Sequence, residues 1–188
     1  LGPAPLTNKA YWGPPIRAGV PQKALSVNMG AHSNVETLDF QHDALRPELI
    51  EGINQDQRTN QSMPVRTFSS TRLPPLASQP TAAVNRQQIR RTQFRESGLS
   101  SAQALALAQA RMDRSVDEVV SATGEVDAMR YGDVLRTRGL VGLRGAGVLY
   151  DGLYYVKRVT HTINKGSYKQ RFRLTREGLG TTTPTVRP

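Results

Sequence analysis

The chain has 188 residues, a formal net charge of +10 and no cysteine, which excludes a disulfide framework and a thiolate metal site. Its three histidines are scattered, and no apolar run approaches the roughly 18 residues that a membrane helix needs, so we expect neither a metal site nor membrane insertion. The mean hydropathy of −0.48 is low for a compact globule, so we expect partners to complete the core, and the surplus of Lys and Arg favours acidic surfaces.

The first 21 residues contain no predicted helix or strand. Proline fixes φ and removes a backbone donor, and this stretch holds several prolines, including Pro14 and Pro15. The only tryptophan, Trp12, lies here, and it either packs on its own domain or anchors this arm on a neighbouring subunit. Because the chain begins at Leu1 rather than at a methionine, we also expect it to be a fragment of a longer protein.

Residues 24–52 show the alternation of apolar and polar side chains that is typical of β-strands. The apolar positions of two runs are Leu25, Val27 and Met29, then Val35, Leu38 and Phe40. Residues 48–51 fit a short third strand. Residues 1–53 are therefore predicted to be an extended arm followed by strands.

Residues 54–97 are polar and rich in Gln, Arg, Ser, Thr and Pro. Few apolar side chains cannot offset the entropy lost when a chain becomes ordered, so we predict a linker here. A linker of this length is unusual inside a compact domain, and it is expected either to be disordered or to lie across a partner.

One helix is predicted from Ser100 to about residue 116. Ser100 and Gln103 have the spacing of a capping box, and alternate alanines from 102 to 110 have high helix propensity. A single apolar stripe is formed by Leu105, Ala108, Met112 and Val116. We expect this stripe to cover a sheet.

After the helix the hydrophobic period changes from 3.6 to 2, which indicates strands. The predicted strands are residues 119–123, 134–137, 153–163 and 168–175, separated by glycine-containing turns. The fold class is therefore mainly β with one α-helix (α+β), as a small barrel or curled sheet capped by the helix.

The last two strands form a predicted hairpin around Lys165-Gly166. With these two residues in the turn, the facing pairs are Ile163 with Tyr168, His161 with Gln170, Val159 with Phe172, and Lys157 with Leu174. This register gathers the large apolar side chains on one side, where burial should fix it. If the loop instead has three residues, a bulge must restore the same facing. His161 is expected to bond the amide of Gln170 rather than to act in catalysis.

The other face of the hairpin carries the candidate interface residues Arg158, Lys169, Arg171 and Arg173, which we group with Trp12. Arg158 and Arg173 fall opposite each other, and like charges in that position repel. The face is either solvated or neutralised by an acidic partner surface.

We find no catalytic motif in the sequence: no cysteine nucleophile, no Gly-x-Ser-x-Gly, no His-Glu-x-x-His and no phosphate-binding loop. The acid pairs Asp117-Glu118 and Glu125-x-Asp127 have the spacing of ordinary surface acids. We therefore expect a protein that is not an enzyme and that binds no cofactor or metal.

The chain resembles the late control D family of phages, which are baseplate hub proteins of contractile tails and contractile injection systems. The strongest match is the hairpin pattern Gly152-x-Tyr154-Tyr155-Val156-x-x-Val159-x-His161, a turn, then Tyr168-x-x-x-Phe172-x-Leu174-x-Arg176. The alanine-rich helix, Ala122-Thr123-Gly124, Tyr131-Gly132-Asp133-Val134 and the run from Asn34 to Phe40 are also similar to the family.

This resemblance implies a homotrimer that joins the tail tube to the central spike as a symmetry adaptor, through tail-tube-like β-barrel domains related to the hub part of type VI secretion spike proteins. It implies that residues 98–180 form the helix and one such barrel, that residues 1–53 belong to an upstream hub domain, and that residues 181–188 are a C-terminal tail. The implied partners are the tail tube or tube-initiator protein, the spike protein and other baseplate components. The implied location is the assembled particle, a phage virion tail or an injection-system baseplate, built in the bacterial cytoplasm.

The alternative function is a nucleic-acid-binding β-barrel module. The charge of +10 favours it, as do four aromatic residues near basic ones: Tyr154, Tyr155, Tyr168 and Phe172. Aromatic side chains in a basic groove stack on bases. Because two of the four, Tyr168 and Phe172, fall on the face predicted to be buried, nucleic acid is the less favoured partner.

Overall fold

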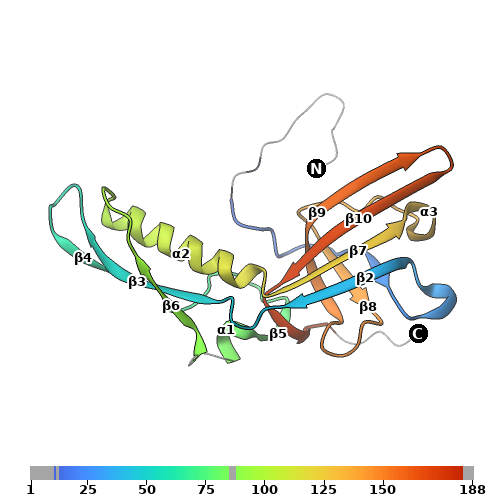
Figure 1. The fold of residues 1–188 in the computed structure, drawn as a ribbon, viewed down its shortest axis with the longest axis horizontal. Helices are drawn as coiled ribbons and strands as arrows, with labels where there is room; N and C mark the ends of the chain where they lie inside the picture. Colours follow the sequence, from blue (N-terminus) through green and yellow to red (C-terminus); the bar gives the residue numbers. More distant parts are fainter. Residues whose placement is uncertain (1–10, 12, 85–87, 184–188) are drawn as a thin grey trace.

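The computed structural model describes residue 11, residues 13–84 and residues 88–183. Figure 1 shows a large curled sheet on one side and a smaller sheet lying along one long helix on the other. Strands account for 44% of the residues and helices for 17%, so the prediction of a mainly β fold is confirmed.

The elements fall into three groups. The large sheet contains β1 (Gln22–Ser26), β2 (Val35–His42), β7 (Val120–Asp127), β8 (Leu140–Arg144), β9 (Gly152–Asn164) and β10 (Ser167–Arg176). The other strands are β3 (Glu48–Gln55), β4 (Ser62–Arg66) and β6 (Arg90–Phe94) in a small sheet, and β5 (Ala77–Pro80) with β11 (Gly178–Thr181). The helices are α1 (Thr81–Val84), α2 (Ser101–Asp117) and α3 (Ala128–Tyr131), with a 3₁₀ turn at Gly30–His32.

The large sheet has the strand order β1-β8-β9-β10-β7-β2 and curls into a half-barrel. Its two edge strands are consecutive in the chain, and Asn34 joins them. The backbone N–H of Asn34 donates to the Ser26 carbonyl at 3.0 Å, and its side-chain oxygen accepts the Ser26 N–H at 2.8 Å. The N-terminal strands thus lie in the same sheet as the C-terminal hairpin, and the prediction of a separate upstream domain was wrong on this point.

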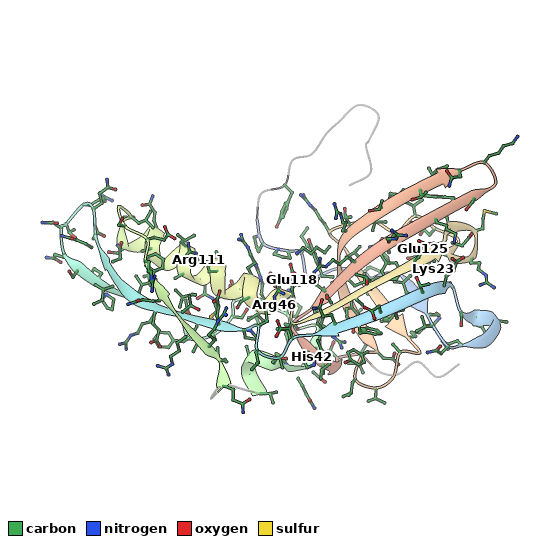
Figure 2. All side chains as sticks on the ribbon, in the orientation of Figure 1. Lys23, His42, Arg46, Arg111, Glu118 and Glu125 are labelled. Carbon is green, nitrogen blue, oxygen red and sulfur yellow. The ribbon has the colours of Figure 1, made fainter. Side chains whose placement is uncertain are left out.

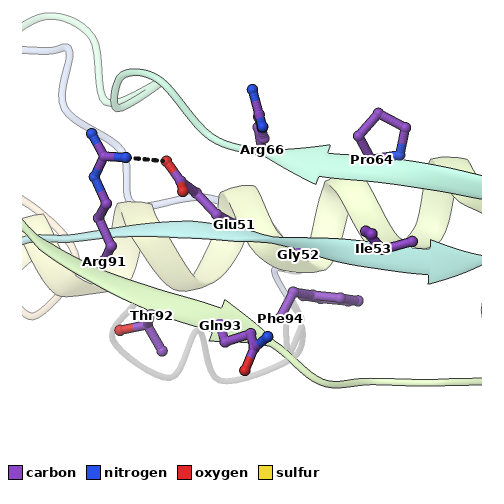
Figure 3. A pocket seen from close by; sticks show the side chains of 9 residues that line it. All are labelled: Glu51, Gly52, Ile53, Pro64, Arg66, Arg91, Thr92, Gln93 and Phe94. Carbon is purple, nitrogen blue, oxygen red and sulfur yellow. Dashed lines mark ion pairs between the residues drawn. The ribbon is translucent and has the colours of Figure 1, made fainter.

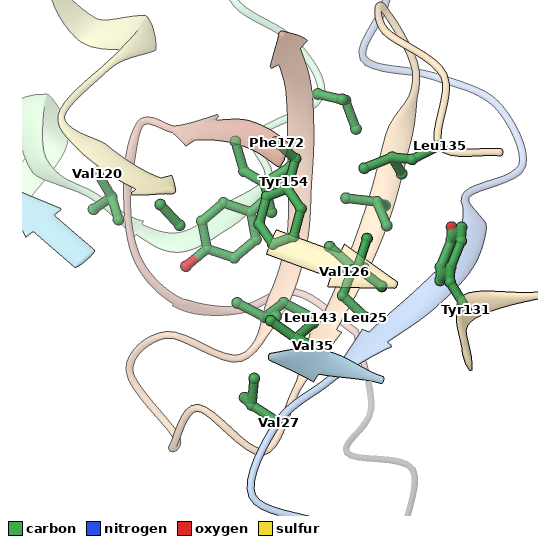
Figure 4. Close-up of a cluster of buried hydrophobic side chains, with 14 of the residues drawn as sticks. Leu25, Val27, Val35, Val120, Val126, Tyr131, Leu135, Leu143, Tyr154 and Phe172 are labelled. Atoms are coloured by element: carbon green, nitrogen blue, oxygen red, sulfur yellow. The ribbon is translucent and has the colours of Figure 1, made fainter. Parts of the chain in front are cut away.

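The core of the half-barrel lies between its strands, as Figure 4 shows. Tyr154 and Leu174 are completely buried there and Phe172 is 2% exposed. Burying a large apolar side chain contributes about 1.5–3 kcal/mol, so these residues hold the curl. Gly124 lies inside β7 and not in one of the glycine-containing turns between strands. Glycine is needed there because a Cβ would be 2.4 Å from the Thr37 carbonyl oxygen and 2.6 Å from Phe172 Cζ.

The hairpin of β9 and β10 confirms the predicted register from Ile163–Tyr168 through Val159–Phe172. Gly166 in the turn has φ +79°, the left-handed conformation that glycine tolerates best. Beyond Arg173 the pairing shifts, so that Leu174 faces Val156 and not Lys157. Lys157 is the extra residue of a β-bulge, and the bulge re-aims its side chain.

The segment 54–97, predicted to be a linker, is mostly packed structure. It contributes the end of β3 with β4, β5, α1 and β6, and the small sheet has the order β4-β3-β6. Only one face of this sheet is buried, by Ile50, Val65 and Phe94, one from each strand. A sheet with one buried face needs few apolar residues, which is why the composition resembled that of a linker.

The helix α2 begins with the predicted capping box, since Ser100 accepts the Gln103 N–H and Gln103 accepts the Ser100 N–H. The predicted stripe is correct at Ala108, Met112 and Val116, but Leu105 is 45% exposed and Ala104 is buried instead. Ala104 and Ala108 pack on the small sheet. The helix therefore covers the small sheet, and the prediction that it caps the barrel was wrong, because two of the three strands that it covers, β4 and β6, had been assigned to a linker.

Candidate interaction surface

The four basic residues predicted on the outer face of the hairpin are Arg158, Lys169, Arg171 and Arg173. Arg158 lies directly opposite Arg173, as predicted. Three of the four form ion pairs with acids of this chain, and Arg158 forms none within the described residues. Trp12, the fifth candidate, lies outside the described residues.

The acids that neutralise Lys169 and Arg171 come from the neighbouring strands. Lys169 Nζ lies 2.8 Å from Glu36 Oε2 and 3.0 Å from Glu125 Oε1, and Arg171 Nη2 lies 3.1 Å from Glu125 Oε2. Hydrogen bonds from Lys169 and Arg171 lower the pKa of Glu125, and the hydrogen bond to Glu36 raises the pKa of Lys169. This part of the hairpin face thus needs no acidic partner.

Glu118, just after α2, collects three cations from different parts of the chain. Its Oε2 lies 3.2 Å from Arg46 Nη2 and 3.4 Å from Arg173 Nη2, and its Oε1 pairs with the ammonium of Lys157. Figure 2 shows Arg46 and Glu118 where the long helix meets the large sheet. Burial, together with the nearby Arg173 and Arg46, lowers the pKa of Lys157. The bulge in β9 is what brings Lys157 into this group.

A buried ion network joins the two parts of the molecule. Arg17 Nη1 lies 2.7 Å from Glu177 Oε2, and Arg17 Nη2 lies 2.8 Å from Asp117 Oδ1. Asp117, the last residue of α2, also pairs with Arg72 at 2.9 Å. Glu177, between β10 and β11, accepts the backbone N–H of Ala77 at 2.9 Å. The network therefore connects the N-terminal arm, the long helix, the loop before β5 and the large sheet.

Asp113 attaches the loop after β4 to the same helix. It accepts hydrogen bonds from the Ser70 hydroxyl at 2.9 Å, the Thr71 N–H at 2.8 Å and the Gln109 amide at 3.2 Å. Burial would raise the pKa of Asp113, but the hydrogen bonds from Thr71, Ser70 and Gln109 outweigh it, and the pKa is lowered. The carboxylate stays charged and holds the loop in place.

A groove of about 820 Å³ follows this junction. Its walls are the arm around Tyr11 and Pro14, the side of α2 that carries Arg114, and the strand residues Tyr155 and Lys157. The Tyr11 hydroxyl donates to the Pro14 carbonyl at 2.8 Å, which fixes the turn of the arm. The groove thus brings together residues that are more than a hundred positions apart.

A second hollow lies on the open face of the small sheet (Figure 3). Its best-defined contact is the ion pair between Arg91 Nη1 and Glu51 Oε1 at 3.3 Å. Gly52, Ile53 and Phe94 also line it. In the described part of the chain, no group of three or more His, Cys, Asp or Glu residues could hold a metal ion. Nor is any helix there long and apolar enough to cross a bilayer.

His161 was predicted to form a hydrogen bond with the amide of Gln170, and the structure shows a different partner. Its Nδ1 lies 3.0 Å from the Tyr168 hydroxyl. Gln170 is buried, and its amide instead accepts the Leu135 N–H at 2.7 Å and donates to the Asp133 carbonyl at 2.9 Å. A buried amide must satisfy both its donor and its acceptor, and the loop after α3 offers both partners.

The sequence interpretation missed Arg17, Asp117, Glu118 and Glu177. Their partners are far away in the chain, up to 160 positions for Arg17 and Glu177, so no local spacing reveals them. The only signal was the acid pair Asp117-Glu118, which was read as an ordinary surface pair. Its position at the end of the predicted helix was the clue, since a helix end is where separate elements meet.

The fold is similar to that of two tail proteins of known structure. A tail protein from Neisseria meningitidis MC58 matches 86% of this chain and 46% of its own length, with a TM-score of 0.55 and 15% identity. The 43 kDa tail protein of prophage MuSo2 from Shewanella oneidensis matches 86% of this chain and 44% of its own, with a TM-score of 0.52 and 12% identity. The chain thus spans less than half the length of these proteins, and at such identities the likeness concerns the fold. No family model and no curated protein sequence matches the chain.

Proposed function

We propose that this chain is a structural subunit of a phage tail or of a related contractile injection system. The observation that carries the proposal is the fold, which is similar over 86% of the chain to a bacterial tail protein and to a prophage tail protein. The ordered motifs that resemble late control D proteins support it from the sequence, and those motifs lie in β2, α2, β7, β9 and β10 and at the end of α3.

We further propose that the subunit belongs to the baseplate hub, as a homotrimer that joins the tail tube to the spike. The half-barrel supports this role, because a tail-tube-like barrel needs neighbours to complete it. Within the described residues, the edge strand β2 pairs only with β7, and Leu38 and Phe40 on it are partly exposed beside a hollow that Ala146 also lines. An unpaired strand edge with apolar neighbours is a site where another chain can add.

The proposed role is mechanical, without catalysis or a cofactor. Its support is the sequence, which has no catalytic motif, and the use of the charged groups near the groove as ion pairs and hydrogen bonds between elements. The proposed location is the assembled particle.

The nucleic-acid-binding alternative loses part of its support in the structure. Tyr154 is completely buried and Phe172 is 2% exposed, so neither ring can stack on a base. Arg176 lies over the Tyr154 ring at 4.4 Å and is itself buried. Two of the four aromatic residues that suggested base stacking thus belong to the core.

The proposal is tested by locating the protein in a particle. An epitope-tagged chain, expressed with the tail proteins of its source, should sediment with assembled tails, and gold-labelled antibody should mark the end where tube and spike meet. A tagged chain that stays in the soluble fraction while tails assemble would contradict the structural role. Antibody label along the whole tube would contradict the proposed hub position but not the structural role.

A further inference from the structure

The surroundings of Glu118 contain more positive than negative charge. Arg46, Lys157 and Arg173 contact its carboxylate, and Arg158 lies beside Lys157 and opposite Arg173. Arg114 lines the same groove as Lys157 and Glu118 and forms no ion pair within the described residues. We call Arg46, Arg114, Lys157, Arg158 and Arg173 the cationic cluster.

The acids nearest to the cluster are already engaged. Asp117 pairs with Arg17 and Arg72, and Asp113 accepts hydrogen bonds from the loop after β4. Within the described residues, Glu118 is therefore the one carboxylate that forms ion pairs with the cluster, and it contacts three of the five cations. The surplus is local, since Lys169 on the same strand as Arg173 lies between two carboxylates.

The cluster also has hydrogen-bond donors to spare. The side chains of Arg46 and Arg173 each use one N–H, toward Glu118, although a guanidinium carries five. Arg173 Nε is buried and has no partner within the described residues. The side chains of Arg46, Lys157 and Arg173 are 42–45% exposed, whereas that of Glu118 is 13% exposed. A largely buried carboxylate thus contacts half-exposed cations, whose remaining donors stay available to an anion.

We propose that the cationic cluster docks an acidic segment of a protein partner, an extended peptide that carries several carboxylates. The adjoining groove of about 820 Å³ is walled by Pro14 and Tyr155, surfaces that suit a peptide. A protein segment is favoured over nucleic acid, because Tyr154 and Phe172, two of the aromatic rings that could have stacked on bases, are buried in the core. The inference deepens the proposed function and rests on it only in taking the partner to be another tail component.

The test uses the whole 188-residue chain and a fluorescein-labelled peptide of six glutamates, with binding followed by fluorescence anisotropy at low and high salt. We expect salt-sensitive binding that the double variant R46Q/R173Q weakens about tenfold. The matched control is Lys169→Gln, a cation of similar exposure on β10 that two acids neutralise, and it should change the affinity less than about twofold. Glu118→Gln should strengthen binding, since it removes the competing carboxylate. If the cluster serves only to stabilise the fold, Glu118→Gln should destabilise the protein without raising its affinity for the peptide.

Three results would overturn the proposal: no binding of the glutamate peptide, binding that R46Q/R173Q leaves unchanged, or tighter binding of a six-nucleotide thymidine strand at the same arginines. The third result would assign the cluster to nucleic acid. Thermal unfolding of each variant shows that it is folded, and both arginines are half-exposed at the surface. Failure of this docking site would leave the mass of the assembled protein unchanged, so it is distinguishable from failure of the proposed hub role.

Discussion

Replacing Arg17 with methionine should destabilise the protein more than any substitution on the hairpin face. Arg17 is 5% exposed and contacts both Glu177 and Asp117, whose elements belong to different parts of the fold. Methionine keeps most of the side-chain volume and removes the charge. Glu177, whose side chain is 3% exposed, then remains buried without a cation.

The expected loss in the free energy of unfolding depends on which partners Asp117 and Glu177 keep. Removing one partner of a buried ion pair costs about 3–5 kcal/mol. Asp117 keeps Arg72, and Glu177 keeps the Ala77 N–H, so we expect the lower end of this range. For a chain of this size, about 3 kcal/mol lowers the melting temperature by roughly 6–12 °C.

The assay is urea unfolding followed by circular dichroism, with thermal unfolding as a second measure. Arg171→Met is the matched control: Arg171 is paired with Glu125 but its side chain is 75% exposed, so its loss should cost less than about 1 kcal/mol. The double variant R17M/E177Q should recover most of the loss, because no buried charge is then left alone. A cost below about 1 kcal/mol for Arg17→Met, or no recovery in the double variant, would refute the reasoning.

Three further predictions concern single sites. The pKa of Asp113 is lowered in the fold, so its stabilising effect is complete above about pH 4 and is lost as the pH falls through the lowered pKa. Asp113→Asn should therefore be less stable than the native chain at pH 7 and should lose less stability on acidification. Urea midpoints measure both effects, and parallel stability curves in acid would contradict the prediction. Gly124→Ala places a methyl group against Thr37 and Phe172 and should cost about 1–3 kcal/mol, whereas Gly142→Ala, with its nearest contact at 3.8 Å, should cost less; equal costs would show that the sheet adapts. Filter binding should detect no salt-sensitive affinity for DNA or RNA, and a steep salt dependence would revive the alternative function.

Features determined by neighbouring residues were predictable from the sequence. The turn at Lys165-Gly166 and the alternation on both sides of it set the hairpin register, and Ser100 with Gln103 set the start of α2. In each case the deciding contacts are a few residues apart. The exception within the hairpin is Lys157, whose bulge coincides with an ion pair to Glu118 on another element.

Features that depend on distant residues were not predictable. The small sheet has a polar sequence because α2 covers only one of its faces, and nothing near residues 62–66 or 90–94 indicates that cover. The predicted interface residues Lys169, Arg171 and Arg173 are in the expected place, but Glu36, Glu118 and Glu125 of the same chain pair with them. Which acids neutralise a basic strand face is decided by the order of strands in the sheet, and the order β9-β10-β7-β2 appears only in the folded chain.

Multi-angle light scattering of the purified protein at high concentration tests the central claim most directly, because a hub subunit must assemble with copies of itself. We expect a mass three times that of the 20.7 kDa protomer, independent of moderate salt. A mass of one protomer at every concentration would contradict the proposed role in a trimeric hub.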